Sequence, residues 1–116
     1  MNRADIGRAA EGAAAEFLQA KGFFIVERNF RIKAGEIDLV ARDRDEIVFV
    51  EVRARRASGF GGAAASVGGA KRRKLLRAAS VWLQARRWTG PCRFDVVAID
   101  DGSAEHITAA FGACGL

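Results

Sequence analysis

Apolar residues recur at helical spacing near the start of the chain. Asp5 is a suitable N-cap, the apolar positions between Ile6 and Leu18 fall on one side of a helix, and Gly22 follows the last turn as a C-cap signal. Together these signals predict a helix over residues 5–21.

A second amphipathic stretch begins at Lys71. Its apolar side chains face one way and its basic side chains the other, and Gly90-Pro91 ends the pattern. The spacing predicts a helix from Lys71 to about Trp88, whose inner face carries Leu75, Ala79, Trp82 and Leu83.

Segments rich in β-branched and aromatic residues lie between and after these helices. The charged turn 43–46 joins two of them, and Asp101-Gly102 is a turn signal between the last two. The pattern predicts five strands, at residues 23–31, 36–42, 47–53, 93–100 and 104–111. The order is therefore α-β-β-β-α-β-β, in a single α/β domain of residues 1–116.

Residues 57–70 interrupt this alternation. They consist almost entirely of glycine, alanine and serine, a composition that does not form a packed element unaided. We expect them to form a flexible loop between the third strand and the second helix.

The composition fits one globular domain. The chain has 116 residues, half of them apolar, and a mean hydropathy near zero. No run approaches the ~20 apolar residues of a membrane helix, and the charged N-terminus differs from a signal peptide. We therefore expect a cytoplasmic protein that does not interact with a membrane.

The cysteines and the histidine are too few and too scattered for a zinc site. Cys92 and Cys114 form no CxxC pair, and His106 is the single histidine. The sequence predicts two reduced structural thiols, and His106 is assigned no role.

Charge is distributed unevenly along the chain, which has a net charge of +5. From Arg53 to Arg93 there are eleven basic residues and no acidic one, whereas the remainder holds eight basic and all 14 acidic residues. This asymmetry indicates a polyanionic partner, nucleic acid in the first place. The alternative is a basic helix face that is merely solvated.

Two carboxylates are predicted to meet on the middle hairpin. If its turn contains an even number of residues, antiparallel register places Asp38 opposite Glu51 and Glu36 opposite Arg53, with Ile37 and Leu39 together on the other face. Unbridged carboxylates in this position repel by up to about 1 kcal/mol. A divalent cation such as Mg²⁺ would remove the repulsion; alternatively, the acids face solvent and pair with arginines.

Glu11 is a third candidate ligand. Helical spacing places it beside the apolar stripe of the first helix, from which it could reach the same cation. The alternative is a surface glutamate with a solvated carboxylate.

Basic residues crowd the start of the second helix, where they oppose the helix macrodipole. Stability does not favour this placement, whereas binding of phosphates would, with affinity that falls with salt and without base readout. The predicted nucleic-acid-binding residues are Arg55, Arg56, Lys71, Arg72, Arg73, Lys74 and Arg77.

The segment GEIDL at residues 35–39, followed by EVR at residues 51–53, resembles the D…ExK signature of restriction-endonuclease-like (PD-(D/E)XK) nucleases. More closely, the chain resembles the YraN family of small bacterial proteins along nearly its whole length. The matching segments are the opening GxxxEGAAAxFLxxKGF, then RNFR, GEIDLVA, VFVEVRAR, the glycine-rich run, KRRKLL, RFDVVAI and HITAAF.

The resemblance implies a restriction-endonuclease-like core, with a central mixed sheet flanked by helices. It also implies a site formed by Glu11, Asp38 and Glu51, with Glu36 nearby, and kinship with archaeal Holliday-junction resolvases. The nuclease signature has lysine where this chain has Arg53. Arginine stays charged and cannot act as a base, although it can stabilise charge on a phosphate.

Three functions follow as hypotheses. The first is an endonuclease dependent on Mg²⁺ or Mn²⁺ that acts on DNA, including branched or junction structures, as a homodimer suited to two-fold junctions. In it, Asp38 and Glu51 hold the metal, Glu36 or Glu11 completes its shell, and Arg53 clamps the scissile phosphate. The second is a nucleic-acid-binding module that kept the fold and lost the reaction. The third is an adaptor whose basic face binds an acidic protein.

Overall fold

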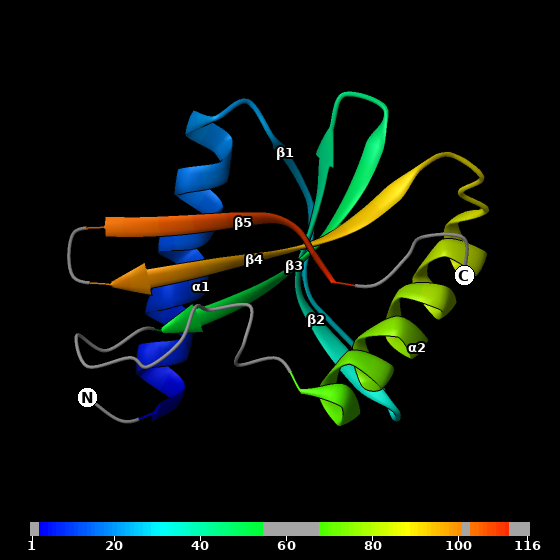
Figure 1. Cartoon of the computed structure of the whole chain (residues 1–116), viewed down its shortest axis with the longest axis horizontal. Helices are drawn as coiled ribbons and strands as arrows, with labels where there is room; N and C mark the ends of the chain where they lie inside the picture. Colours follow the sequence, from blue (N-terminus) through cyan, green and yellow to red (C-terminus); the bar gives the residue numbers. More distant parts are fainter. Residues whose placement is uncertain (1–2, 55–67, 101–102, 112–116) are drawn as a thin grey trace.

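The computed structural model describes residues 3–54, 68–100 and 103–111 (Figure 1). Its elements follow the predicted order, which confirms the fold class. They are α1 (Arg3–Ala20), β1 (Phe24–Ile32), β2 (Gly35–Asp43), β3 (Glu46–Ala54), α2 (Gly69–Arg86), β4 (Cys92–Asp100) and β5 (Ser103–Phe111).

The five strands form one mixed sheet in the order β1-β2-β3-β4-β5. Neighbours pair antiparallel except β3 and β4, which are parallel. Parallel neighbours need a crossover connection, and the segment that contains α2 supplies it.

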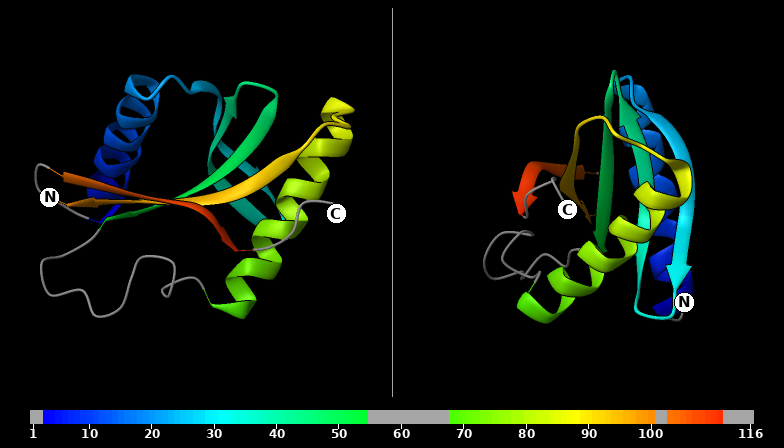
Figure 2. Two further views of the ribbon diagram at one scale, coloured as in Figure 1. Left: turned by 45° about the horizontal axis from the view of Figure 1, so that its top comes forward. Right: turned by 90° about the vertical axis from the view of Figure 1, so that its right-hand side faces the viewer.

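The two helices lie on opposite faces of the sheet, so the protein has two cores (Figure 2). One core packs α2 against the sheet, and the buried Leu75, Ala79 and Trp82 confirm the predicted inner face of this helix. The other core packs α1 against Leu39, Val48, Val50 and Val97, among others.

The hairpin between β2 and β3 turns through Arg44 and Asp45, because Asp43 pairs directly with Glu46. Arg44 has a left-handed φ of 58°, as two-residue hairpin turns require. The turn therefore contains an even number of residues, the condition on which the predicted meeting of Asp38 and Glu51 depended.

The helix α2 begins at Gly69, two residues before the predicted start, so the end of the predicted 57–70 loop is helical. Residues 55–67 lie outside the described part of the chain. The helix ends at Arg86, because Arg87 adopts a left-handed φ of 53° and its N–H bonds to the carbonyls of Gln84 and Leu83.

Glu27 anchors α2 to β1. Its Oε1 accepts hydrogen bonds from Trp82 Nε1 at 3.0 Å and from Arg86 Nη2 at 2.7 Å. The buried indole therefore has its polar atom satisfied, which fixes the orientation of the helix over the sheet.

Cys92 is buried at the start of β4 and is disulfide-bonded, so the prediction of two reduced thiols is wrong. Pairing depends on the spatial separation of the cysteines, which sequence spacing does not give. In the described part of the chain, no helix has the length and apolarity needed to cross a bilayer.

Gly35 allows α2 to approach the turn between β1 and β2. A Cβ atom at this position would lie 2.6 Å from the backbone carbonyl oxygen of Lys74. The backbones of Gly35 and Lys74 could separate only if α2 moved away from the sheet, so glycine is required at position 35.

Gly35→Ala should therefore lower the free energy of unfolding by about 1–3 kcal/mol, the usual cost of overpacking. Urea denaturation measures this loss. Gly12→Ala is the matched control: no atom lies within 4 Å of a Cβ at Gly12 in α1, and alanine there should stabilise by about 0.5–1 kcal/mol. A Gly35→Ala variant as stable as the parent would contradict the close approach.

Candidate metal centre and nucleic-acid interface

Asp38 lies where β2 and β3 separate. The paired residues of this hairpin run from Asp43 and Glu46 to Leu39 and Val50. One residue further along, Asp38 Oδ2 accepts the backbone N–H of Val52 at 2.8 Å. Where the strands separate, the backbone N–H of Val52 is therefore bonded to a side-chain carboxylate and not to a backbone carbonyl of the neighbouring strand.

The strand is distorted at the same level. Ile37 packs in the core under α2 and Leu39 in the core under α1, so the prediction that both face the same way is wrong. Pairing with β1 steps from Leu39 and Arg28 to Ile37 and Phe30, past Asn29, whose φ is 55°. Asp38 is paired in neither ladder, although the register with β1 is the same on both sides of it, so strict alternation of faces fails at this residue.

Glu51 is buried in β3, with 4% of its side chain exposed, on the face covered by α2. Its Oε2 lies 2.5 Å from Lys71 Nζ and 3.3 Å from Arg53 Nη2. Two cations therefore compensate a carboxylate that burial alone would destabilise.

Asp38 and Glu51 interact directly. Burial raises the pKa of Asp38 to about 8, with further contributions from its hydrogen bond to Glu51 and from the negative charge of Glu51. The N–H of Val52 opposes this rise, and the charge of Glu11 adds to it. Near neutral pH the Asp38 carboxyl group therefore keeps its proton, which removes the repulsion between the two acids.

The remaining predicted acids occupy different places. Glu11 is half-buried on α1, within electrostatic reach of Asp38. Glu36 is half-exposed beside the turn between β1 and β2, where its Oε2 lies 2.8 Å from Arg31 Nε. Glu11 is therefore near enough to influence the charge of Asp38 without joining the pair, and Glu36 has a partner on β1.

The carboxylate pair has the chemistry of a hard-cation site. Within the residues that the structure describes, no three His, Cys, Asp or Glu side chains converge as ligands. The pair would therefore supply two oxygen ligands and leave the others to water or phosphate, which is how proteins usually hold Mg²⁺.

A groove of about 590 Å³ lies between the turn joining β1 to β2 and the first turns of α2. It is lined by residues 31–36 on one side and by Ala70, Lys71, Lys74 and Leu75 on the other. Because Lys71 also contacts Glu51, the groove adjoins the carboxylate pair. Four basic side chains line it, those of Arg31, Lys33, Lys71 and Lys74.

The predicted basic residues of α2 divide into two groups. Arg72, Arg73, Lys74 and Arg77 are exposed, whereas Lys71 is half-buried against Glu51. The first turn of α2 carries no acidic residue, and Gly68 at its N-cap offers no side-chain cap. This end of the helix therefore keeps its positive potential. Arg55 and Arg56 lie outside the described residues.

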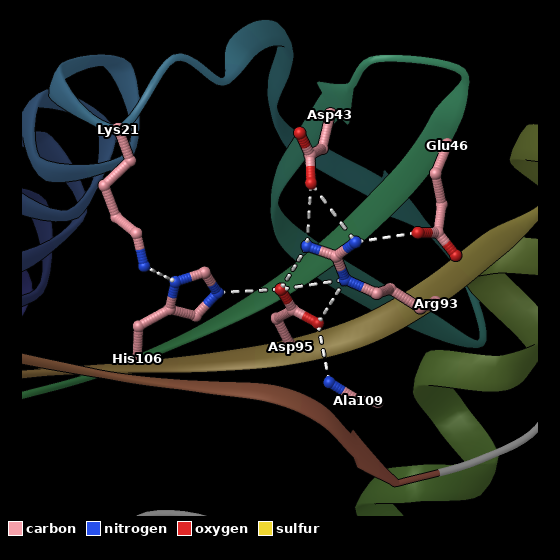
Figure 3. A network of polar contacts seen from close by, with 7 residues as sticks. All are labelled: Lys21, Asp43, Glu46, Arg93, Asp95, His106 and Ala109. Atoms are coloured by element: carbon pink, nitrogen blue, oxygen red, sulfur yellow. Dashed lines mark hydrogen bonds and ion pairs between the residues drawn. The ribbon is translucent and has the colours of Figure 1, made fainter.

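A second polar cluster lies on the opposite face of the sheet (Figure 3). Fully buried Asp95 accepts hydrogen bonds from Arg93 Nε at 3.0 Å and from the N–H of Ala109 at 2.9 Å, and lies 2.7 Å from His106 Nε2. Burial would raise the pKa of Asp95, but these bonds hold it below its usual value. His106 Nδ1 in turn lies 2.7 Å from Lys21 Nζ.

This cluster ties together segments that are distant in sequence. Arg93 Nη1 lies 2.7 Å from Glu46 Oε1 and 3.4 Å from Asp43 Oδ2, at the turn of the β2–β3 hairpin. We assign the cluster a structural role, because the buried carboxylate of Asp95 is paired within it with Arg93, His106 and the N–H of Ala109. Sequence analysis missed it, although the alternation of Arg93 and Asp95 in an apolar strand signals a buried ion pair.

Comparison with known proteins places the chain in a family. Residues 10–99 match the model of the family described as "Uncharacterised protein family UPF0102". The chain belongs to this family. The match confirms the resemblance to YraN-like proteins and specifies no reaction.

Over the aligned residues, the relatives are about half identical to the chain. It is 53% identical to a UPF0102 protein of Janthinobacterium sp. (strain Marseille), over 82% of this chain and 77% of the relative. It is 53% identical to one of Hahella chejuensis, over 80% and 76%, and 48% identical to one of Alkalilimnicola ehrlichii, over 96% and 90%.

The raised pKa of Asp38 makes stability depend on pH. Between about pH 4 and about pH 8 the folded chain holds a proton that the unfolded chain, with the ordinary aspartate pKa of 3.8, has released. The free energy of unfolding should therefore fall as pH rises through this window, by at most about 1.4 kcal/mol per pH unit for one proton. Urea denaturation without divalent metal, across the window, measures this slope.

Asp38→Asn provides the comparison, since asparagine does not titrate and should flatten the profile. Asp95 has a lowered pKa, so its contribution to the free energy of unfolding is lost only when the pH falls to the acid end of this window. It does not produce a loss of stability as the pH rises. Equal slopes in the parent and in Asp38→Asn would contradict the raised pKa of Asp38.

Proposed function

We propose that the protein is a metal-dependent endonuclease that acts on DNA, with branched or junction structures as the preferred substrates. The observation that carries the proposal is the contact between Asp38 and Glu51, two buried carboxyl groups beside a groove lined with cations. A stable fold gains little from such a pair, whereas Mg²⁺ or Mn²⁺ would replace the proton on Asp38 and gain oxygen ligands.

Each side chain has a defined task in this proposal. Bound Mg²⁺ or Mn²⁺ would polarise the scissile phosphate and lower the pKa of a water molecule. Asp38 and Glu51 hold the ion, and the backbone N–H of Val52 keeps the Asp38 carboxylate oriented. Glu11 adds negative charge from α1, and Arg53, which lies next to Glu51, stabilises charge on the phosphate.

The exposed basic side chains of α2 would bind the sugar–phosphate backbone. Arg72, Arg73, Lys74 and Arg77 lie on the helix that borders the groove. Contacts of this type depend steeply on salt and carry little sequence information. We therefore propose recognition of DNA structure, by a cytoplasmic protein that acts as a homodimer on two-fold substrates.

A second function is favoured by Arg53, which stands where the nuclease signature has lysine. Because arginine cannot accept a proton from water, a protein with this substitution could bind DNA without cutting it. In that case the basic groove and helix would retain their role, and the carboxylate pair would be a remnant. An adaptor for an acidic protein would use the same basic face.

Cleavage of branched, flapped and linear DNA in Mg²⁺ or Mn²⁺ separates these functions. We expect cleavage by the parent, and a loss of at least about a hundredfold in Asp38→Asn and Glu51→Gln, because each removes a ligand that acts on the scissile phosphate. Glu16→Gln is the matched control, since Glu16 is an exposed acid on α1 outside the groove lining and should leave the rate within about threefold of the parent.

Salt-dependent DNA binding without cleavage in either metal would establish the inactive binding module. Weaker binding to DNA than to polyglutamate would establish the adaptor. Cleavage that survives both carboxylate substitutions would place the reaction elsewhere in the protein.

A further inference from the structure

Lys71 belongs to two sites at once. Its ammonium lies 2.5 Å from Glu51 Oε2, and its side chain also lines the groove between α2 and the turn joining β1 to β2. With 43% of its side chain exposed, Lys71 is much more accessible than Glu51. It therefore stands between the buried carboxylate and the open groove.

Lys71 and a divalent cation would compete for the same oxygen. A metal ion bound to Glu51 Oε2 would lie at about 2.1 Å, the usual distance for Mg²⁺. An ammonium at 2.5 Å from that oxygen would then lie close to a doubly charged ion, and the two cations would repel each other. The lysine side chain is long and flexible, so it can move away.

The groove is the place to which Lys71 can move. Lys74 lies three residues further along α2, on the same side of the helix, and Lys33 lines the opposite wall. The single acidic side chain among the lining residues, Glu36, is paired with Arg31. An anion in the groove would thus be attracted by Lys33, by Lys74 and by the positive end of α2 even while Lys71 is bound to Glu51.

We propose that this groove binds a phosphate of the nucleic-acid strand, and that a divalent cation at Glu51 releases Lys71 to bind the same phosphate. The inference rests on the proposed function for the metal at Asp38 and Glu51. It adds a binding site for the strand next to the metal centre, and it makes Lys71 the residue that connects the two.

Release of Lys71 makes metal and phosphate binding cooperative. Separation of Lys71 from Glu51 costs free energy, and once one ligand has bound and separated them the second ligand no longer bears this cost. Each ligand should therefore bind more tightly when the other is present, and the two affinities should increase by the same factor. If the metal instead used Glu51 Oε1 and left Lys71 in place, the two ligands would bind independently.

The cooperativity is measured with fluorescein-labelled single-stranded DNA, from its anisotropy with and without Ca²⁺, an oxygen-seeking cation. We expect Ca²⁺ to tighten DNA binding by about tenfold in the parent. In Lys71→Met, DNA affinity should be the same with and without Ca²⁺. Lys74 lines the same groove, and the salt bridge to Glu51 is made by Lys71. Lys74→Met should therefore weaken DNA binding, while Ca²⁺ still tightens it by about tenfold.

A titration with Mn²⁺ in the absence of DNA gives an independent readout. Lys71→Met should bind Mn²⁺ more tightly than the parent, because the competing ammonium is gone, whereas Lys74→Met should match the parent. Circular dichroism establishes that all three proteins are folded.

The two proposals fail in different ways. If Mn²⁺ does not bind the parent, the metal site is wrong and this inference is overturned with it. If Mn²⁺ binds through Asp38 and Glu51 but the Ca²⁺ effect on DNA is unchanged in Lys71→Met, the inference alone is overturned. It is also overturned if polyglutamate of equal charge displaces the DNA as effectively as unlabelled DNA does.

Discussion

The interaction on which the rest of the site depends is the hydrogen bond from the N–H of Val52 to Asp38, at the place where two central strands separate. It holds a carboxyl group inside the sheet, next to a second one on Glu51. Burial of two acids in contact costs free energy, and the protein offsets that cost with a proton on Asp38 and with the cations Lys71 and Arg53 beside Glu51. Binding of a cation is the use that we propose for a pair of acids maintained in this way.

The surrounding elements bring α2 to this pair. Glycine at position 35 lets the helix backbone pass close to the turn between β1 and β2, and Glu27 fixes the far part of the helix through Trp82. As a result, the first turn of α2 places Lys71 against Glu51 and leaves Lys74 in the groove. The cations thus lie along a path from Asp38 and Glu51 to the exposed basic face of the helix.

Local patterns predicted the elements and the hairpin register, because caps, alternation and a two-residue turn are encoded by neighbouring residues. Contacts between residues that are distant in sequence could not be predicted in this way. Lys71 was expected on the outer face of its helix, and its contact with Glu51 depends on how α2 crosses the sheet. The split of Ile37 and Leu39 between two cores, and the cluster around Asp95 and His106, arise from distortions and pairings between distant segments.

The central claim is that Asp38 and Glu51 bind a divalent cation in exchange for a proton, and calorimetric titration with Mn²⁺ at about pH 6 and about pH 8 tests it most directly. Because the pKa of Asp38 is about 8, the metal must displace a proton at the lower pH, and affinity should rise by up to about tenfold per pH unit. Asp38→Asn should bind weakly at both pH values. Mn²⁺ affinity that is the same at both pH values, or that survives Asp38→Asn, would contradict the account.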